Sequence, residues 1–186
     1  MVAVPMCEAP HVETVVEDAG WGDPSALIEQ AAAATLTRLG LDPQAYEISV
    51  LLCDDARIRA LNADFRDQDK PTNVLSWPAV DLSPDNPGDP PYPPEPGSPD
   101  DPEALGDIAL ALGVCRAEAA AAGKPFDHHL THLVVHAVLH LLGHDHETEV
   151  DALLMEGRET AILAEMGIPD PYAVAPDNGP QGGQNR

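Results

Sequence analysis

The sequence has few cysteines, few aromatic residues and few basic residues among its 186 positions. Its three cysteines, Cys7, Cys53 and Cys115, lie far apart and form no Cys-x-x-Cys pair. This pattern excludes a disulfide framework and a thiolate metal site, and it favours a reducing cytoplasm. No run approaches the roughly 18 apolar residues of a membrane span, and the first residues lack the basic and apolar regions of a signal peptide. We therefore expect a cytoplasmic protein with no membrane partner.

The charge balance is strongly acidic, with 32 Asp plus Glu against 9 Lys plus Arg and a formal net charge of −23. Such a chain repels nucleic acid at long range, although a local concentration of basic residues can reverse this effect. The length favours a single domain, which at this size buries enough surface to fold without a disulfide or a structural metal. A metal ion would therefore need a functional reason.

Proline and acidic residues are concentrated in one stretch. Residues 81–103 hold nine of the 20 prolines, seven acidic residues and no basic residue, a composition that sustains neither a helix nor a strand. We expect residues 1–172 to form one domain, with an exposed acidic insert at about 81–103. The segment 173–186 is poor in apolar residues and is predicted to be a disordered tail.

Four segments have the length and β-branched content of strands, and five have helical periodicity, several of them followed by glycine. The predicted strands are His11–Glu17, Tyr46–Cys53, Asn73–Trp77 and Ala104–Leu112. The predicted helices are about Pro24–Leu39, Asp55–Phe65, Val114–Ala122, Asp127–Leu142 and Glu149–Met166. This order predicts an α+β fold, in which a small mixed four-stranded sheet packs with about five helices.

Seven of the eight histidines lie between His128 and His146. His136 and His140 are four residues apart, so on a helix they project from one face and can reach one metal ion. Gly143 can end that helix in the left-handed conformation and turn the chain back, which brings His146 toward the same ion. We predict a zincin-like metal site formed by His136, His140 and His146, with His144 as a competitor for the third position.

Three neutral imidazoles suit Zn²⁺ and leave a fourth position for water, whose pKa falls to about 7 on such an ion. The pattern therefore indicates a hydrolytic centre with one Zn²⁺ per chain. Asp145 and Glu147 are candidate acceptors that would orient an imidazole. The metzincin proteases share this spacing, but the position of their catalytic Glu is occupied here by Ala137, which cannot accept a proton.

Four of the nine basic residues, Arg57, Arg59, Arg66 and Lys70, fall within fourteen positions. A guanidinium beside a metal-bound hydroxide would supply an anion stabiliser and a nucleophile for phosphodiester cleavage. We assign a catalytic role to Arg66 and substrate binding to Arg59 and Lys70.

Several ordered blocks of the chain resemble the YbeY family of bacterial endoribonucleases, over roughly Tyr46 to Tyr172 without the insert. These blocks are LNADFRDQDKPTNVLSWP (61–78), LGDIALAL (105–112), HAVLHLLGHDHE (136–147), Met155 and MGIPDPY (166–172). The resemblance implies a metal-dependent, single-strand-specific endoribonuclease that matures the 3′ end of small-subunit ribosomal RNA and takes part in ribosome quality control.

The resemblance further implies Zn²⁺ on His136, His140 and His146, an arginine at Arg66 facing the metal, and partners that include ribosomal RNA and the ribosome or ribosomal proteins. The insert is longer than is usual in the family, and we expect its residues 84–102 to cover the RNA cleft or to dock a partner. Two alternatives stay open, namely a zinc metallopeptidase with an unusual base, and a non-catalytic ribosome assembly factor with a structural zinc.

Overall fold

The computed structural model describes residues 9–173 of the 186-residue chain. Cys7 and the predicted tail from residue 174 onward lie outside the described residues. All four predicted strands and all five predicted helices are present, with bounds that differ by one or two residues at most ends. In chain order the elements are β1 (His11–Val16), α1 (Ser25–Arg38), β2 (Tyr46–Cys53), α2 (Asp55–Arg66), β3 (Val74–Pro78), β4 (Glu103–Ala111), α3 (Leu112–Ala121), α4 (Phe126–Leu141) and α5 (Glu149–Glu165).

The four strands form one mixed sheet in the order β1-β2-β4-β3. β1, β2 and β4 run parallel, and β3 pairs antiparallel with β4. The α+β fold with a mixed four-stranded sheet is therefore confirmed. Two short 3-10 helices, Ala19–Trp21 and Pro43–Ala45, precede α1 and β2 and were not predicted, because three-residue turns leave no periodic pattern.

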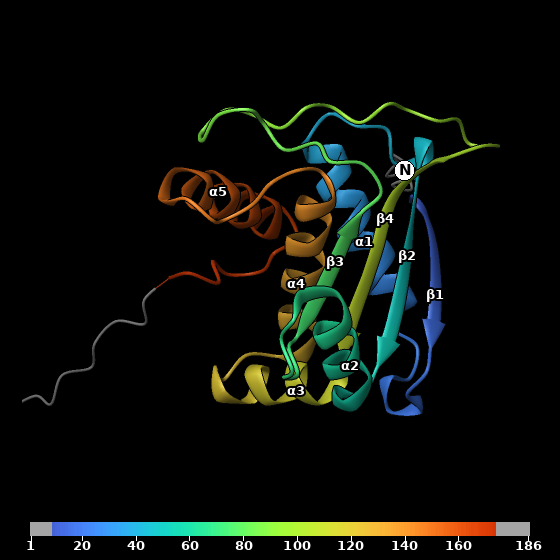
Figure 1. Ribbon diagram of the computed structural model, residues 1–186, viewed down its shortest axis with the longest axis vertical. Helices are drawn as coiled ribbons and strands as arrows, with labels where there is room; N and C mark the ends of the chain where they lie inside the picture. The colour runs from blue at the N-terminus through green and yellow to red at the C-terminus, as the bar shows by residue number, and fades with distance from the viewer. Residues whose placement is uncertain (1–8, 174–186) are drawn as a thin grey trace, which may run out of the picture.

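The core lies mainly between the sheet and the two helices α1 and α4. Nine of the 16 residues of α4 are buried, because this helix contacts β3, α1, α3 and α5 at once. Figure 1 shows α4 standing beside the sheet, with α5 on the side of α4 away from the strands. A smaller cluster around Ile58 and Leu75 packs α2 against the other face of the sheet. Helix α4 is thus packed on several sides, and the histidines lie on its remaining, less buried face.

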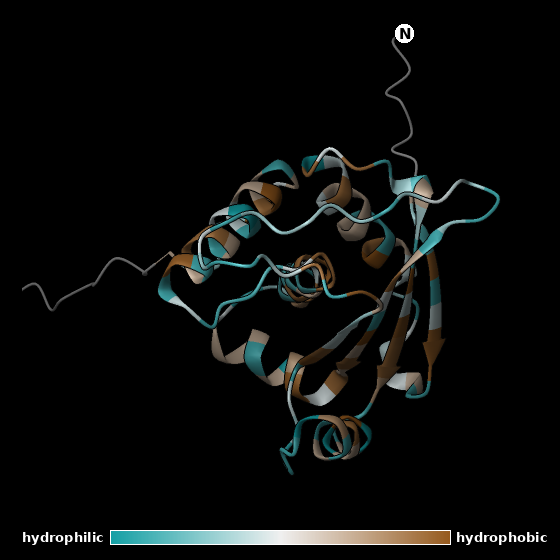
Figure 2. Cartoon of the chain, turned by 45° about the horizontal axis from the view of Figure 1, so that its top comes forward, coloured by the Kyte–Doolittle hydropathy of each residue, from teal (hydrophilic) through white to brown (hydrophobic). Residues whose placement is uncertain are grey.

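The acidic insert connects β3 to β4 without forming a helix or a named strand, as its composition predicts. It first runs beside α5, where the Gly88 N–H donates to Asp151 Oδ1 at 2.8 Å. It then crosses to the start of β2, where the Gly97 N–H donates to the Ala45 carbonyl at 3.1 Å. Figure 2 shows this connection mostly in pale to hydrophilic colours, crossing the end of the domain that is turned toward the viewer. The insert therefore packs along the end of the domain.

Within residues 9–173, none of the helices combines the length and apolar character needed to cross a membrane.

Candidate metal centre

The turn after α4 brings three histidines together. Gly143 has φ +93°, its N–H donates to the His140 carbonyl at 3.1 Å, and the His144 N–H donates to the Leu139 carbonyl at 3.0 Å. This pair of bonds is the Schellman motif, which ends a helix and reverses the chain. As the glycine in the sequence predicts, the turn directs His146 back toward α4.

The ligand nitrogens of His136, His140 and His146 all lie within 4.8 Å of one another. The Nε2 atoms of His136 and His140 are 3.0 Å apart, close to the roughly 3.3 Å that two nitrogens span on a tetrahedral Zn²⁺. The ring centroid of His146 lies 5.5 Å from that of His136 and 5.1 Å from that of His140. The three imidazoles therefore converge on one point.

The hydrogen bonds of two of these rings reveal where their protons are. His136 Nδ1 lies 2.5 Å from Glu159 Oε1, and His140 Nδ1 lies 2.8 Å from the His144 carbonyl oxygen. A carboxylate and a carbonyl only accept, so each Nδ1 carries a proton, and each Nε2 is the nitrogen left to bind a metal ion. These two Nε2 atoms face each other at 3.0 Å, where a proton or a metal ion between them would remove the repulsion of their lone pairs. This donor set fits a metal ion such as Zn²⁺.

Electrostatics keep His140 in the form that binds a metal. Burial, reinforced by the neighbouring His136 and His146, lowers the pKa of His140 to about 4 from its ordinary 6.5. Because an imidazole binds a metal ion only through an unprotonated ring nitrogen, a proton does not compete with the ion for His140 at neutral pH. His144, which competed for the third position in the sequence, is buried and lies outside this cluster.

Glu159 is a residue of the candidate site that the sequence analysis missed. It lies on α5 with 0% of its surface exposed, on the same stripe as the buried Met155, Ile162 and Leu163. Burial alone would raise the pKa of Glu159, but hydrogen bonds from His132, His136 and Tyr172 hold it at about 2. The sequence does contain a sign of this role, because an acidic residue at a core position of an amphipathic helix needs hydrogen-bonding partners. The candidate acceptors Asp145 and Glu147 bond to neither of these two rings: Glu159 accepts from His136 and the His144 carbonyl from His140, while Asp145 accepts from the Glu147 N–H.

A cleft of about 570 Å³ opens beside the three imidazoles, between α4 and the segment from the end of α2 to β3. Arg66 and Lys70 line this cleft together with His136, His140 and His146. One N–H of Arg66, at Nη2, donates to the Ser76 carbonyl at 3.1 Å, which aligns the guanidinium along β3. No residue of the insert lines this cleft.

Arg59 lies differently from the other predicted site residues. Its guanidinium forms a two-contact ion pair with Asp69, at 2.8 and 3.2 Å, and it does not line the cleft. Asn62, by contrast, is buried and supports the wall of the cleft, since its side-chain amide donates to the Lys70 carbonyl at 2.9 Å. Its own carbonyl accepts from the Gln68 N–H, which closes the turn after α2.

Comparison with known proteins now decides the family. The chain matches the family described as "Endoribonuclease YbeY" over residues 18–167, which include every residue lining the cleft. The chain belongs to the YbeY family. Three relatives are each called "Endoribonuclease YbeY". The protein of Ruegeria pomeroyi is 53% identical, over 88% of this chain and 98% of its own.

The other two relatives match this chain with similar identity and coverage. The protein of Dinoroseobacter shibae is 55% identical over 87% of this chain and 90% of its own, and that of Cereibacter sphaeroides is 54% identical over 88% and 99%. The YbeY resemblance read from the sequence is thus confirmed, and the family is one of endoribonucleases.

Proposed function

We propose that this chain is a zinc-dependent endoribonuclease that cleaves single-stranded RNA. Its proposed cellular role is maturation of the 3′ end of small-subunit ribosomal RNA and ribosome quality control, in the cytoplasm and with the ribosome as partner. The YbeY family membership supports the reaction class. The observation that carries the proposal is the pair of Nε2 atoms of His136 and His140, 3.0 Å apart and with both Nδ1 atoms bonded to acceptors, in a cleft that Arg66 also lines.

The roles of the residues follow from the geometry. His136, His140 and His146 would hold the ion, which when bound would lower the pKa of water or of a 2′-hydroxyl in the cleft. Arg66 has five N–H donors, and among the described residues only one hydrogen bond engages them. The remaining donors can bind the scissile phosphate and offset the charge that develops on it.

Lys70 and Arg59 are proposed to contribute less to RNA binding than Arg66. Lys70 lines the same cleft and is placed to contact the RNA backbone next to the scissile phosphate. Arg59 lies outside the cleft and forms an ion pair with Asp69. We propose that it contacts RNA that extends beyond the cleft, where an RNA phosphate would replace Asp69 as its partner. Both contacts act through charge and should weaken as salt rises.

The peptidase alternative lacks a proton acceptor in the required place. Ala137 follows the first histidine ligand and lines the cleft, where a metzincin would place its Glu. Glu159 does not replace it, because this carboxylate is fully buried and faces Nδ1 of His136, the ring nitrogen opposite the predicted metal position. The geometry therefore favours phosphodiester over peptide hydrolysis.

The structural-zinc alternative requires a closed site with four ligands. The described residues supply three converging imidazoles, and His146 is exposed to solvent beside the cleft. An open fourth position of this kind is typical of catalytic zinc.

A substrate comparison tests the proposed reaction. Zinc-loaded wild type should cut an end-labelled single-stranded RNA. It should cut neither the same RNA sequence in a duplex nor casein. Substitution Arg66→Ala should abolish most cleavage, whereas Arg57→Ala, on the same helix but paired with Glu17 at 3.3 Å, should not. Cleavage of casein would support the peptidase. Absence of any cleavage by folded, zinc-loaded protein would favour the assembly factor, or an activity that needs a ribosomal partner.

A further inference from the structure

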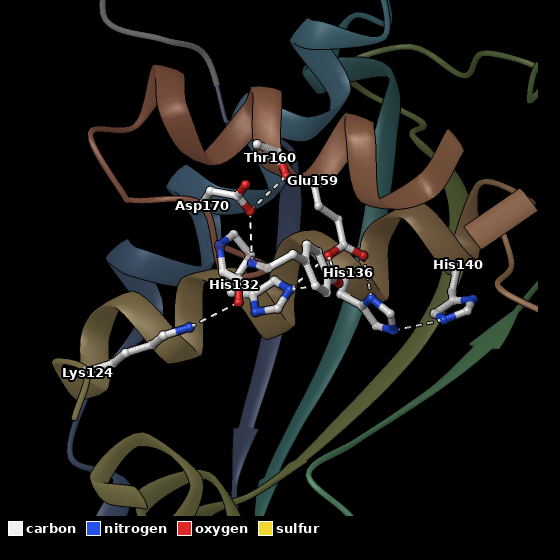
Figure 3. A network of polar contacts seen from close by, with 9 residues as sticks. Lys124, His132, His136, His140, Glu159, Thr160 and Asp170 are labelled. Carbon is white, nitrogen blue, oxygen red and sulfur yellow. Dashed lines mark hydrogen bonds and ion pairs between the residues drawn. The ribbon is translucent and has the colours of Figure 1, made fainter. Parts of the chain in front are cut away.

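A second layer of hydrogen bonds surrounds the candidate metal centre, and its centre is the buried carboxylate of Glu159. Oε1 of Glu159 accepts from His136 Nδ1 at 2.5 Å. Oε2 accepts from His132 Nε2 at 2.8 Å and from the Tyr172 hydroxyl at 2.5 Å. Figure 3 shows His132, His136 and His140 in a row along α4, with Glu159 reaching down from α5. The carboxylate thus joins His136 to two residues outside the cluster of His136, His140 and His146, although His132, His136 and Glu159 also lie close enough together to hold an ion.

Tyr172 belongs to the segment that follows α5, and several contacts aim its hydroxyl at Glu159. The Tyr172 N–H donates to Asp170 Oδ1 at 2.8 Å, and Thr160 donates to the same oxygen at 3.3 Å. On the other side, Lys124 Nζ donates to the Pro171 carbonyl at 3.4 Å. This end of the domain is therefore attached both to α5 and to the connection between α3 and α4.

The carboxylate of Glu159 sets the direction of its three hydrogen bonds. A buried carboxylate is stable in a protein interior when donors satisfy its oxygens, and here three donors point at two oxygens. Because Glu159 only accepts, His136 must carry its proton on Nδ1 and present Nε2 to the cleft. Tyr172 and His132 together hold the other oxygen, so the carboxylate cannot rotate away from His136.

We propose that Tyr172, His132 and Glu159 are positioning residues for the metal centre, with Tyr172 and His132 fixing Glu159, and Glu159 fixing the tautomer and orientation of His136. This inference rests on the metal centre proposed above. It makes the segment after α5 part of the functional site, although that segment contributes no metal ligand. Partners of this kind in other metal sites change metal affinity by about 10- to 100-fold when they are substituted.

Two conservative substitutions test the network. Glu159→Gln keeps the shape but replaces one acceptor by an NH₂ group, which must face either His136 or the pair of His132 and Tyr172. We expect its Zn²⁺ dissociation constant to rise by about 10- to 100-fold. Tyr172→Phe removes one donor only, and we expect a rise near the lower limit, about 10-fold.

The chain offers a matched control for each substitution. Glu118 accepts from Nε2 of His129 at 2.8 Å, also on α4, but His129 is outside the ligand cluster. Tyr92 donates to Asp85 at 2.6 Å within the insert. Glu118→Gln and Tyr92→Phe therefore remove the same kinds of hydrogen bond away from the metal ligands, and neither should change the Zn²⁺ dissociation constant by more than about twofold.

The measurement is Zn²⁺ affinity of the full-length chain by competition with a chromophoric chelator. The absorption spectrum of the Co²⁺-substituted protein and thermal unfolding of the metal-free protein accompany it. A shifted Co²⁺ spectrum with weakened Zn²⁺ binding in Glu159→Gln and Tyr172→Phe supports the network. Lower thermal stability with unchanged affinity and spectrum would overturn it in favour of a purely structural role. His140→Ala is measured in parallel, because unchanged affinity in that variant would refute the metal centre itself rather than the network.

Discussion

Gly143 is the residue whose substitution most directly tests how the turn after α4 builds the site. It adopts φ +93°, and a Cβ built on it would lie 2.6 Å from both the carbonyl carbon and the oxygen of Leu82. Gly123 ends α3 with the same hydrogen-bond motif and φ +63°, but nothing lies within 4 Å of its added Cβ. Comparing alanine substitutions at Gly143 and Gly123 therefore separates the cost of the left-handed backbone from the cost of the steric contact with Leu82.

The expected losses can be estimated for both variants. A left-handed alanine is disfavoured by about 1–2 kcal/mol, and this applies to Gly123→Ala and Gly143→Ala alike. At Gly143 the Leu82 backbone must also shift, and overpacking of this kind destabilises by about 1–3 kcal/mol more. Because His146 follows three residues later, displacement of the turn should also weaken metal binding.

Urea unfolding of the metal-free chain, followed by circular dichroism, measures the first effect, and chelator competition measures the second. We expect Gly143→Ala to have a lower unfolding midpoint than Gly123→Ala and weaker Zn²⁺ binding, while Gly123→Ala keeps the wild-type affinity. Equal midpoints, or equal affinities, would refute the reasoning that the insert packs on the turn and that the turn places His146.

Three further outcomes are expected. Burial lowers the pKa of His140 and of His144 to about 4 in the folded protein. As pH falls, the two histidines therefore bind protons at a higher pH in the unfolded chain than in the folded one. The free energy of unfolding of the metal-free protein, measured with urea, should therefore decrease from pH 6.5 to pH 4, by up to about 3 kcal/mol per histidine; a flat profile would contradict these pKa values. Arg66→Ala should lower kcat by about 100-fold or more with Zn²⁺ affinity unchanged, while Arg57→Ala keeps wild-type kcat, as steady-state cleavage assays can check. Replacing the acidic residues of 81–103 by Asn and Gln should raise RNA affinity and steepen its salt dependence, and titrations that match wild type would reject an electrostatic role for the insert.

Much of the fold could be predicted because the strands and helices carry local patterns. In β2, for example, alternate residues from Tyr46 to Leu52 are buried, and glycine marks the ends of α3, α4 and α5. The three imidazoles were predictable for the same reason, since a four-residue spacing on a helix and a glycine turn are both local features.

The partners of those imidazoles could not be predicted. Glu159 lies 23 positions after His136, and only the packing of α5 against α4 brings the two together at 2.5 Å. Likewise, the pairing of Arg59 with Asp69 depends on how the chain turns after α2, where Asp67 adopts a left-handed conformation with φ 55°. Interactions of this kind depend on tertiary structure rather than on spacing in the sequence.

The most direct test of the account is a Zn²⁺ titration of metal-free wild type, with cleavage of an end-labelled single-stranded RNA as the readout. Activity should be absent without metal, rise linearly and saturate near one ion per chain, and His140→Ala should stay inactive throughout the titration. Full cleavage by the metal-free protein, or by His140→Ala, would contradict the claim that His136, His140 and His146 form a catalytic metal centre.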